Sequence, residues 1–177
     1  MARQNLEARA EKTLRDTESY RVPVPIHLVA QHLNLTLEAA ALGDKVSGML
    51  VVQGDQGAIG YNSAHARVRQ RFTISHEIAH YLLHARRSGK AQLFIDRHVA
   101  FRRDEQSSAG VHREEIEANQ LGAALLMPRR LVQQEVRSQD LDLDDNEAIE
   151  LLAKRFQVST AAMSNRLQNL RILAYEK

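Results

Sequence analysis

A single pentapeptide, His76-Glu77-Ile78-Ala79-His80, constrains this chain more than any other part of its sequence. On an α-helix the side chains of residues i and i+4 lie one above the other on one face, so the two imidazoles can reach the same ion. Glu77 lies about 100° further round the helix than His76, where its carboxylate can act on a water molecule at that ion. Apolar residues flank these positions at helical spacing, at 72, 74, 78, 79, 82 and 83. The pattern therefore predicts a buried helix with two metal ligands, His76 and His80, and one general base, Glu77.

The composition indicates a globular protein without cysteine chemistry. The 177 residues are 44% apolar and 26% charged, as in ordinary globular chains, and none is cysteine. Disulfides and cysteine-ligated zinc are therefore excluded, and any metal must be bound by His, Asp or Glu. Residues 1–20 lack the apolar core of a secretion signal and no stretch is long enough to span a membrane, which predicts a cytoplasmic protein. The formal charge of +2 does not by itself indicate a nucleic-acid partner.

Hydrophobic periodicity and helix-breaking residues predict several helices and a small sheet. A surface helix is expected at residues 3–19, and further helices at 25–33, 63–87, 111–127 and 128–136, with Gly110 breaking the chain before 111. Two more are expected to end near 156 and 170, the first capped by Asp144 or Asp145 and the second by Ser159. Strands are expected at 35–38, at 48–52 and 58–61 around a turn at 54–57, and at 93–101. The predicted fold class is α+β. A mainly helical domain at 1–137, with a small mixed or antiparallel sheet packed on the helix of the two histidines, precedes a helical, helix-turn-helix-like segment at 138–177.

A catalytic zinc needs a third protein ligand besides two histidines and keeps its fourth position for water. His84 continues the i+4 series, but it lies about 12 Å from His76 along the helix axis, too far to share an ion with it. The metzincin arrangement, with Gly at 83 and His at 86, is excluded because the chain has Leu83 and Arg86. The third ligand is therefore expected on a later helix.

The acidic run at 112–119 offers three glutamates as the third ligand. Glu115 is favoured because Asn119 lies one turn further on the same face, where its amide can hold a ligand imidazole from behind. Glu114 and Glu117 stay open as alternatives, as does the interpretation of the whole run as a solvated helix start. Side chains considered for oxyanion stabilisation or substrate contact are Tyr61, His98 and His112, together with His65 and Tyr81.

Two segments together resemble the ImmA/IrrE family of bacterial metallopeptidases. They are residues 69–84, which surround the two histidines, and residues 115–128, which begin Glu115-Ile116-Glu117-Ala118-Asn119. The pair Val46-Ser47-Gly48-Met49 and Ile59-Gly60-Tyr61-Asn62 is also similar to a hairpin of that family. The matched positions imply His76, His80 and Glu115 as metal ligands and Glu77 as the catalytic glutamate. Leu121 and Gly122 stand where such proteins tend to have Phe and Ala, a difference that concerns packing.

The resemblance implies a zincin-like metallo-endopeptidase that makes a limited cut in one partner protein. Such partners are typically helix-turn-helix repressors whose loss switches on stress-response or mobile-element genes. Zn²⁺ is the expected cofactor and Mn²⁺ the alternative, because imidazole and carboxylate ligands accept several divalent ions. In the expected mechanism Glu77 takes a proton from water and passes it to the leaving amine. The strand at 58–61 is expected to offer its edge to an extended substrate.

The C-terminal residues 148–167 are similar to a helix-turn-helix with a short turn at Gln157-Val158. The polar residues suited to a major groove are Thr160, Ser164, Asn165 and Gln168, and the cations suited to phosphate are Lys154, Arg155, Arg166 and Arg171. Acidic residues between 142 and 150 would repel DNA, so packing or protein docking is favoured over DNA binding. The alternatives for the whole chain are a DNA-binding transcriptional regulator with a structural metal site and a toxin–antitoxin component.

Overall fold

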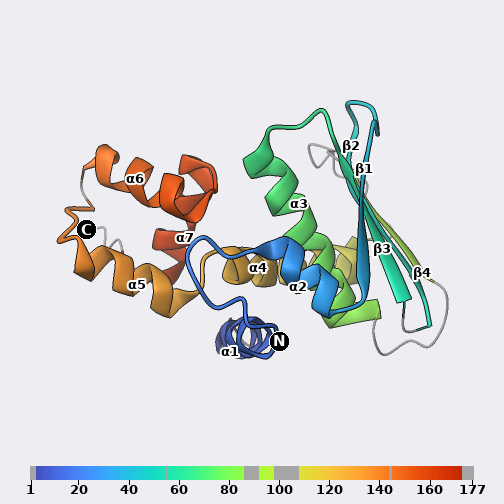
Figure 1. Ribbon diagram of the computed structural model, residues 1–177, viewed down its shortest axis with the longest axis horizontal. Helices are drawn as coiled ribbons and strands as arrows, with labels where there is room; N and C mark the ends of the chain where they lie inside the picture. The colour runs from blue at the N-terminus through green and yellow to red at the C-terminus, as the bar shows by residue number, and fades with distance from the viewer. Residues whose placement is uncertain (1–2, 55, 86–91, 98–107, 144, 173–177) are drawn as a thin grey trace.

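The computed structural model describes residues 3–54, 56–85, 92–97, 108–143 and 145–172 (Figure 1). Its elements are α1 (Arg3–Asp16), α2 (Ile26–His32), β1 (Leu35–Ala40), β2 (Val46–Gln53), β3 (Gln56–Asn62), α3 (Arg67–His80), the π-helical turn η1 (Tyr81–Ala85), β4 (Gln92–Arg97), α4 (Ser108–Leu126), α5 (Arg129–Ser138), α6 (Asn146–Phe156) and α7 (Thr160–Leu170). The described residues thus form seven α-helices and one four-stranded sheet, which confirms the predicted α+β class. None of the described helices is long and apolar enough to cross a bilayer.

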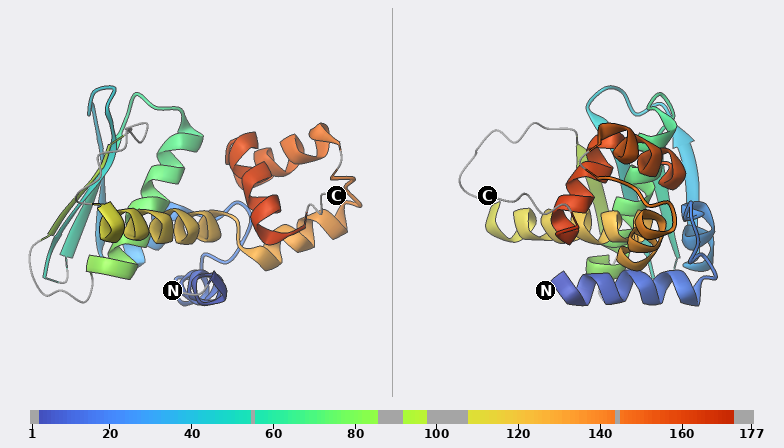
Figure 2. Two further views of the ribbon diagram at one scale, coloured as in Figure 1. Left: turned by 180° about the vertical axis from the view of Figure 1, so that it is seen from behind. Right: turned by 90° about the vertical axis from the view of Figure 1, so that its left-hand side faces the viewer.

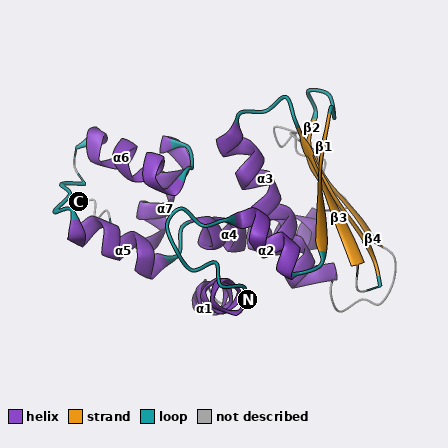
Figure 3. Cartoon of the chain, viewed as in Figure 1, coloured by secondary structure: helices purple, strands orange, loops and turns teal. Residues whose placement is uncertain are grey.

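The sheet is mixed and has the strand order β1-β3-β2-β4. β1 pairs with β3 in parallel, whereas β2 is antiparallel to both β3 and β4. Leu50 and Ile59 are opposite each other and fully buried, while Val51, Leu93 and Ile95 alternate onto the other face and are exposed. Figures 1 and 3 show helices on the first face, and no described helix covers the second. The predicted β2–β3 hairpin is confirmed. The strand predicted at 93–101 is described at 92–97, and residues 98–101 lie outside the described residues.

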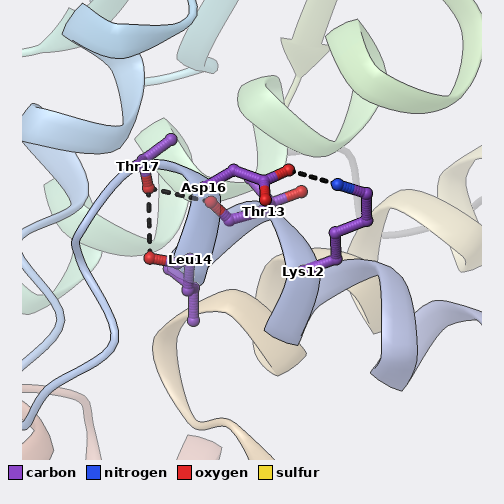
Figure 4. Close-up of polar contacts among 5 residues, drawn as sticks. All are labelled: Lys12, Thr13, Leu14, Asp16 and Thr17. Carbon is purple, nitrogen blue, oxygen red and sulfur yellow. Dashed lines mark hydrogen bonds and ion pairs between the residues drawn. The ribbon is translucent and has the colours of Figure 1, made fainter.

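Helix α1 packs one face on α4 through Leu6, Ala10 and Leu14, which are at most 1% exposed. It therefore belongs to the core, although the sequence suggests a surface helix. Beyond its last residue, the Thr17 hydroxyl donates to the carbonyl oxygens of Thr13 (2.9 Å) and Leu14 (3.4 Å), which also accept from the backbone N–H groups of Thr17 and Ser19 (Figure 4). The Lys12–Asp16 ion pair beside it lies on the surface (Figure 4).

The helix of the two histidines begins at Arg67, later than predicted. The preceding residues form a turn in which Asn62 Oδ1 accepts from the Ala64 N–H (3.0 Å), and the Gln70 side chain donates to the carbonyl oxygens of Ser63 (3.1 Å) and His65 (2.8 Å). These side-chain hydrogen bonds occupy carbonyl oxygens that would accept from backbone N–H groups if the helix began one turn earlier.

Gly110 does not break the chain, because it lies inside α4. An interior glycine costs a helix only about 1 kcal/mol relative to alanine. The fully buried residues Leu121 and Leu125 outweigh that cost, because each buried side chain of this size contributes about 1.5–3 kcal/mol.

Helices α6 and α7 begin as predicted, with Asp145 and Ser159 side chains accepting from backbone N–H groups of the first turn. Gln157 takes the left-handed conformation between them, with φ 54°. Figure 2 shows both helices with α5 at the end of the molecule opposite the sheet. The helix-turn-helix function of this segment and the domain boundary at 137/138 stay predictions.

Two arginines join the C-terminal helices to the rest of the protein. Arg166 of α7 is 5% exposed, donates from Nε to the Met127 carbonyl (2.9 Å) and pairs with both carboxylate oxygens of Glu7 (2.7 and 2.8 Å). Arg71 of α3 donates to the carbonyl oxygens of Gln157 (3.1 Å) and Val24 (2.9 Å). The expectation that Arg166 offers its charge to phosphate is therefore wrong, because Glu7 neutralises it inside the protein.

Candidate metal centre

Helices α3 and α4 cross beside the sheet (Figures 1 and 2). Three side chains converge where the two helices meet. The Nε2 atoms of His76 and His80 lie 3.0 Å apart. Glu115 of α4 places Oε2 3.3 Å from His76 Nε2 and Oε1 3.2 Å from His80 Nε2. Among the described residues this is the group of His, Asp and Glu side chains arranged closely enough to hold a metal ion.

The close approach of α3 and α4 depends on Gly122. A Cβ atom at this position would lie 3.3 Å from both the amide nitrogen and the Cα atom of His76, tighter than ordinary van der Waals contact. Glu115 precedes Gly122 by seven residues, two helical turns, and so lies on the same side of α4. The glycine thus lets the backbone of α4 reach α3 at the level of the first histidine.

The two histidines are buried, and the site reaches the surface at Glu115. His76 and His80 are each 3% exposed, whereas the Glu115 side chain is 32% exposed. Hydrogen bonds from His76 and then His80 lower the pKa of Glu115, so its carboxylate stays ionised at neutral pH. An ionised carboxylate is the form that binds a cation.

The geometry fits one tetrahedral divalent cation. Donor atoms bound at about 2.0–2.1 Å to a tetrahedral ion lie about 3.3 Å from each other, and the three observed separations are 3.0, 3.2 and 3.3 Å. Two imidazoles and one carboxylate form the donor set of zinc peptidases, which leave a fourth position for water. The chemistry of the side chains and their spacing therefore agree.

Glu77 is fully buried, and its carboxylate lies beside strand β2. A Cβ atom on Gly48 would come within 3.4 Å of Glu77 Oε1. Tyr61 of β3 is opposite Gly48 in the sheet and so shares its helix-facing side. The sheet thus forms the wall beside the carboxylate.

Substituting Gly48 by alanine should damage this wall. The added methyl group would overlap the methyl group of Thr73 and lie 3.0 Å from the Gly60 carbonyl oxygen, which belongs to the backbone and cannot turn away. We expect the free energy of unfolding to fall by about 1–3 kcal/mol, as overpacking generally costs, and chemical denaturation measures it. In the control, Gly60→Ala, the methyl group meets only the flexible Met49 side chain. Equal losses in both variants would show that the space beside Glu77 is not special.

The remaining predicted residues lie outside this group. Glu114 is exposed, and Glu117 pairs with Arg113 at 3.2 Å. Asn119 is exposed, and no hydrogen bond joins its amide to either imidazole in the described part of the chain. His112 is exposed on α4, Tyr81 is buried in η1, the loop residue His65 precedes α3, and His98 lies outside the described residues.

The sequence pattern did not predict the aromatic contacts around the two histidines. The His80 ring stacks on Phe94 of β4 with centroids 5.2 Å apart and lies tilted by 51° against His84 of η1 at 5.6 Å. The His76 ring stacks on Phe72 at 6.4 Å. Burial lowers the pKa of His84, which favours its neutral form. Successive side chains of a strand point to opposite faces of a sheet. Once residues 93–95 are assigned to this sheet, that alternation places Phe94 on the helix-facing side and Leu93 and Ile95 on the other.

Comparison with known proteins agrees with this geometry. The profile of Peptidase_M78, described as the IrrE N-terminal-like domain, matches residues 30–168. No curated protein matches the chain in sequence. Among solved structures, a Mycobacterium tuberculosis transcriptional regulator superimposes with a TM-score of 0.61 at 17% identity, over 93% of this chain and 46% of the regulator. That likeness concerns the fold alone, and the chain spans less than half of the regulator. The family profile covers most of the chain, from α2 to α7, and the chain therefore belongs to the IrrE N-terminal-like, or ImmA/IrrE, family of metallopeptidases.

Proposed function

We propose that this protein is a metal-dependent endopeptidase that makes a limited cut in a partner protein, a helix-turn-helix repressor of stress-response or mobile-element genes. The observation that carries the proposal is the convergence of His76, His80 and Glu115 beside the buried carboxylate of Glu77. A repressor substrate implies that the enzyme acts in the cytoplasm.

In this proposal His76, His80 and Glu115 hold a divalent cation, and Zn²⁺ suits their donor atoms. Such a cation would lower the pKa of a bound water molecule and polarise the carbonyl group of the peptide bond to be cleaved. Glu77 takes the proton from the attacking water and delivers it to the leaving amine, so that one carboxylate acts first as base and then as acid. Tyr61, on the same side of the sheet, is available to stabilise the oxyanion.

The strand expected to offer its edge to the substrate lies inside the sheet. β3 cannot offer an edge, because it pairs with β1 on one side and with β2 on the other. β4 pairs only with β2 within the described sheet, and its Phe94 contacts the His80 ring. We propose that an extended segment of the substrate pairs with the free edge of β4, since main-chain pairing aligns a peptide without demanding one sequence.

A second candidate function, a DNA-binding transcriptional regulator with a structural metal site, has the name of the similar solved structure in its favour. Against it, Arg166 is neutralised inside the protein, and Arg155 pairs with Glu135 at 2.6 Å. Of the four cations suited to phosphate, Lys154 and Arg171 are exposed and have no carboxylate partner named above. The peptidase is the better supported of the two.

The test is incubation of the purified protein with repressors encoded beside its gene, with and without a chelator. The peptidase proposal expects a small number of discrete fragments, their loss with the chelator and their return when Zn²⁺ or Mn²⁺ is added. Cleavage that continues unchanged after the metal has been removed would contradict a role for the three ligands. Binding to operator DNA without any cut in the repressors would favour the regulator.

A further inference from the structure

The imidazole of His80 rests against a phenyl ring that belongs to the sheet. The centroids of His80 and Phe94 are 5.2 Å apart and their planes are inclined by 27°. Aromatic pairs attract each other at centroid separations of about 4.5–7 Å when the rings are offset. The corresponding pair at the other histidine, His76 and Phe72, is more distant at 6.4 Å.

Hydrogen bonding gives His80 no comparable support. A metal-binding histidine generally donates its second ring N–H to a carboxylate or a backbone carbonyl, which fixes the orientation of the ring. The Nδ1 atom of His80 is buried, and no described protein group forms a hydrogen bond with it. Ring packing is therefore the contact available to orient this imidazole.

The register of the sheet explains why Phe94 reaches the site. Phe94 is opposite the fully buried Leu50 and so shares the helix-facing side of the sheet. Its neighbours Leu93 and Ile95 lie on the opposite side and are 60% and 42% exposed. Phe94 thus contacts His80, whereas the neighbouring side chains of β4 project to the opposite side of the sheet.

We propose that Phe94 is a positioning residue that holds the His80 imidazole in its metal-binding orientation. The inference rests on the proposed function, since it takes His76, His80 and Glu115 to bind a divalent cation. Without the ring face of Phe94, His80 would keep its donor atom and its tilted contact with the His84 ring, but it would lose the stacked contact that limits rotation of the imidazole. The metal site should then bind more weakly and with a less regular geometry.

The experiment is titration of the full-length, metal-free protein with Co²⁺, whose visible absorption reports coordination geometry. Phe94→Leu keeps an apolar side chain and removes the ring, and Phe94→Tyr keeps the ring. The control on the same strand is Leu93→Ala, which changes the exposed side. We expect Phe94→Leu to bind Co²⁺ about tenfold more weakly, as is usual when a group behind a metal ligand is lost, and with an altered spectrum. Phe94→Tyr and Leu93→Ala should bind as the wild-type protein does.

Two results would overturn the inference. One is a Phe94→Leu protein whose affinity lies within about twofold of the wild type, under 0.5 kcal/mol, with an unchanged spectrum. The other is an equal loss in Leu93→Ala, which would assign the effect to the strand as a whole. Should Phe94→Leu fail to fold by circular dichroism, Phe94→Met, which fills a similar space without a ring, decides the question on the same two readouts. Absence of Co²⁺ binding by the wild-type protein would instead contradict the proposed function.

Discussion

A Glu77→Gln protein should retain its metal and lose peptide hydrolysis. Glutamine keeps the shape of the side chain in its fully buried place beside strand β2, but it cannot accept the proton of the attacking water. General base catalysis contributes about 10²–10⁴-fold to such reactions, so kcat/KM on a cleaved repressor should fall by about that factor. The measurements are fragment formation over time and, on the same preparation, the metal content.

The matched control is Glu114→Gln, which makes the same chemical change at an exposed position on α4 next to the proposed ligand. It should cleave like the wild type. If Glu77→Gln kept most of its activity, another group would have to be the base. If it lost the metal together with the activity, Glu77 would have to be counted among the ligands.

Removal of the Glu7 carboxylate should produce the largest loss of stability. The side chains of Glu7 and Arg166 are 16% and 5% exposed, and within the described part of the chain the guanidinium donates to no other carboxylate. Breaking a buried ion pair by deleting one partner costs about 3–5 kcal/mol, because the remaining charge has neither water nor a counter-ion. We expect Glu7→Ala to fall in this range, measured by urea denaturation.

The chain provides a control for the burial argument in the same helix. The Lys12–Asp16 pair is just as short, at 2.6 Å, but its side chains are 75% and 59% exposed, and exposed pairs contribute about 1 kcal/mol or less. Lys12→Ala should therefore change stability little. The double variant Glu7→Ala, Arg166→Met should be more stable than Glu7→Ala alone, because it also removes the stranded charge. A Glu7→Ala effect no larger than that of Lys12→Ala would mean that water reaches Arg166 freely.

Local patterns account for the parts of the structure that the sequence predicted correctly. The spacing of His76 and His80 is a property of one helix, and the caps Asp145 and Ser159 act within one turn. The β2–β3 hairpin is likewise formed by neighbouring segments. In each case the residues that decide the structure lie within a short stretch of chain.

The parts left open or predicted wrongly depend on contacts between distant segments. Glu114 and Glu115 differ only by about 100° of rotation on one helix, and the crossing of α3 and α4 decides which of them faces the histidines. The parallel pairing of β1 with β3 closes the edge that the hairpin pattern alone leaves open. Arg166 looks like a surface cation until Glu7, 159 residues away in sequence, is placed beside it.

The hydrogen bonds of Arg71 bear on how a shortened form of this protein would fold. Arg71 precedes His76 by five residues on the same helix, and its guanidinium spans from the loop before α2 to the turn between α6 and α7. A protein cut back to residues 1–137 would keep both histidines and all three glutamates of the acidic run. It would nevertheless leave the Arg71 guanidinium hydrogen-bonded on the Val24 side only, so we expect the described C-terminal helices to stabilise the start of the histidine helix.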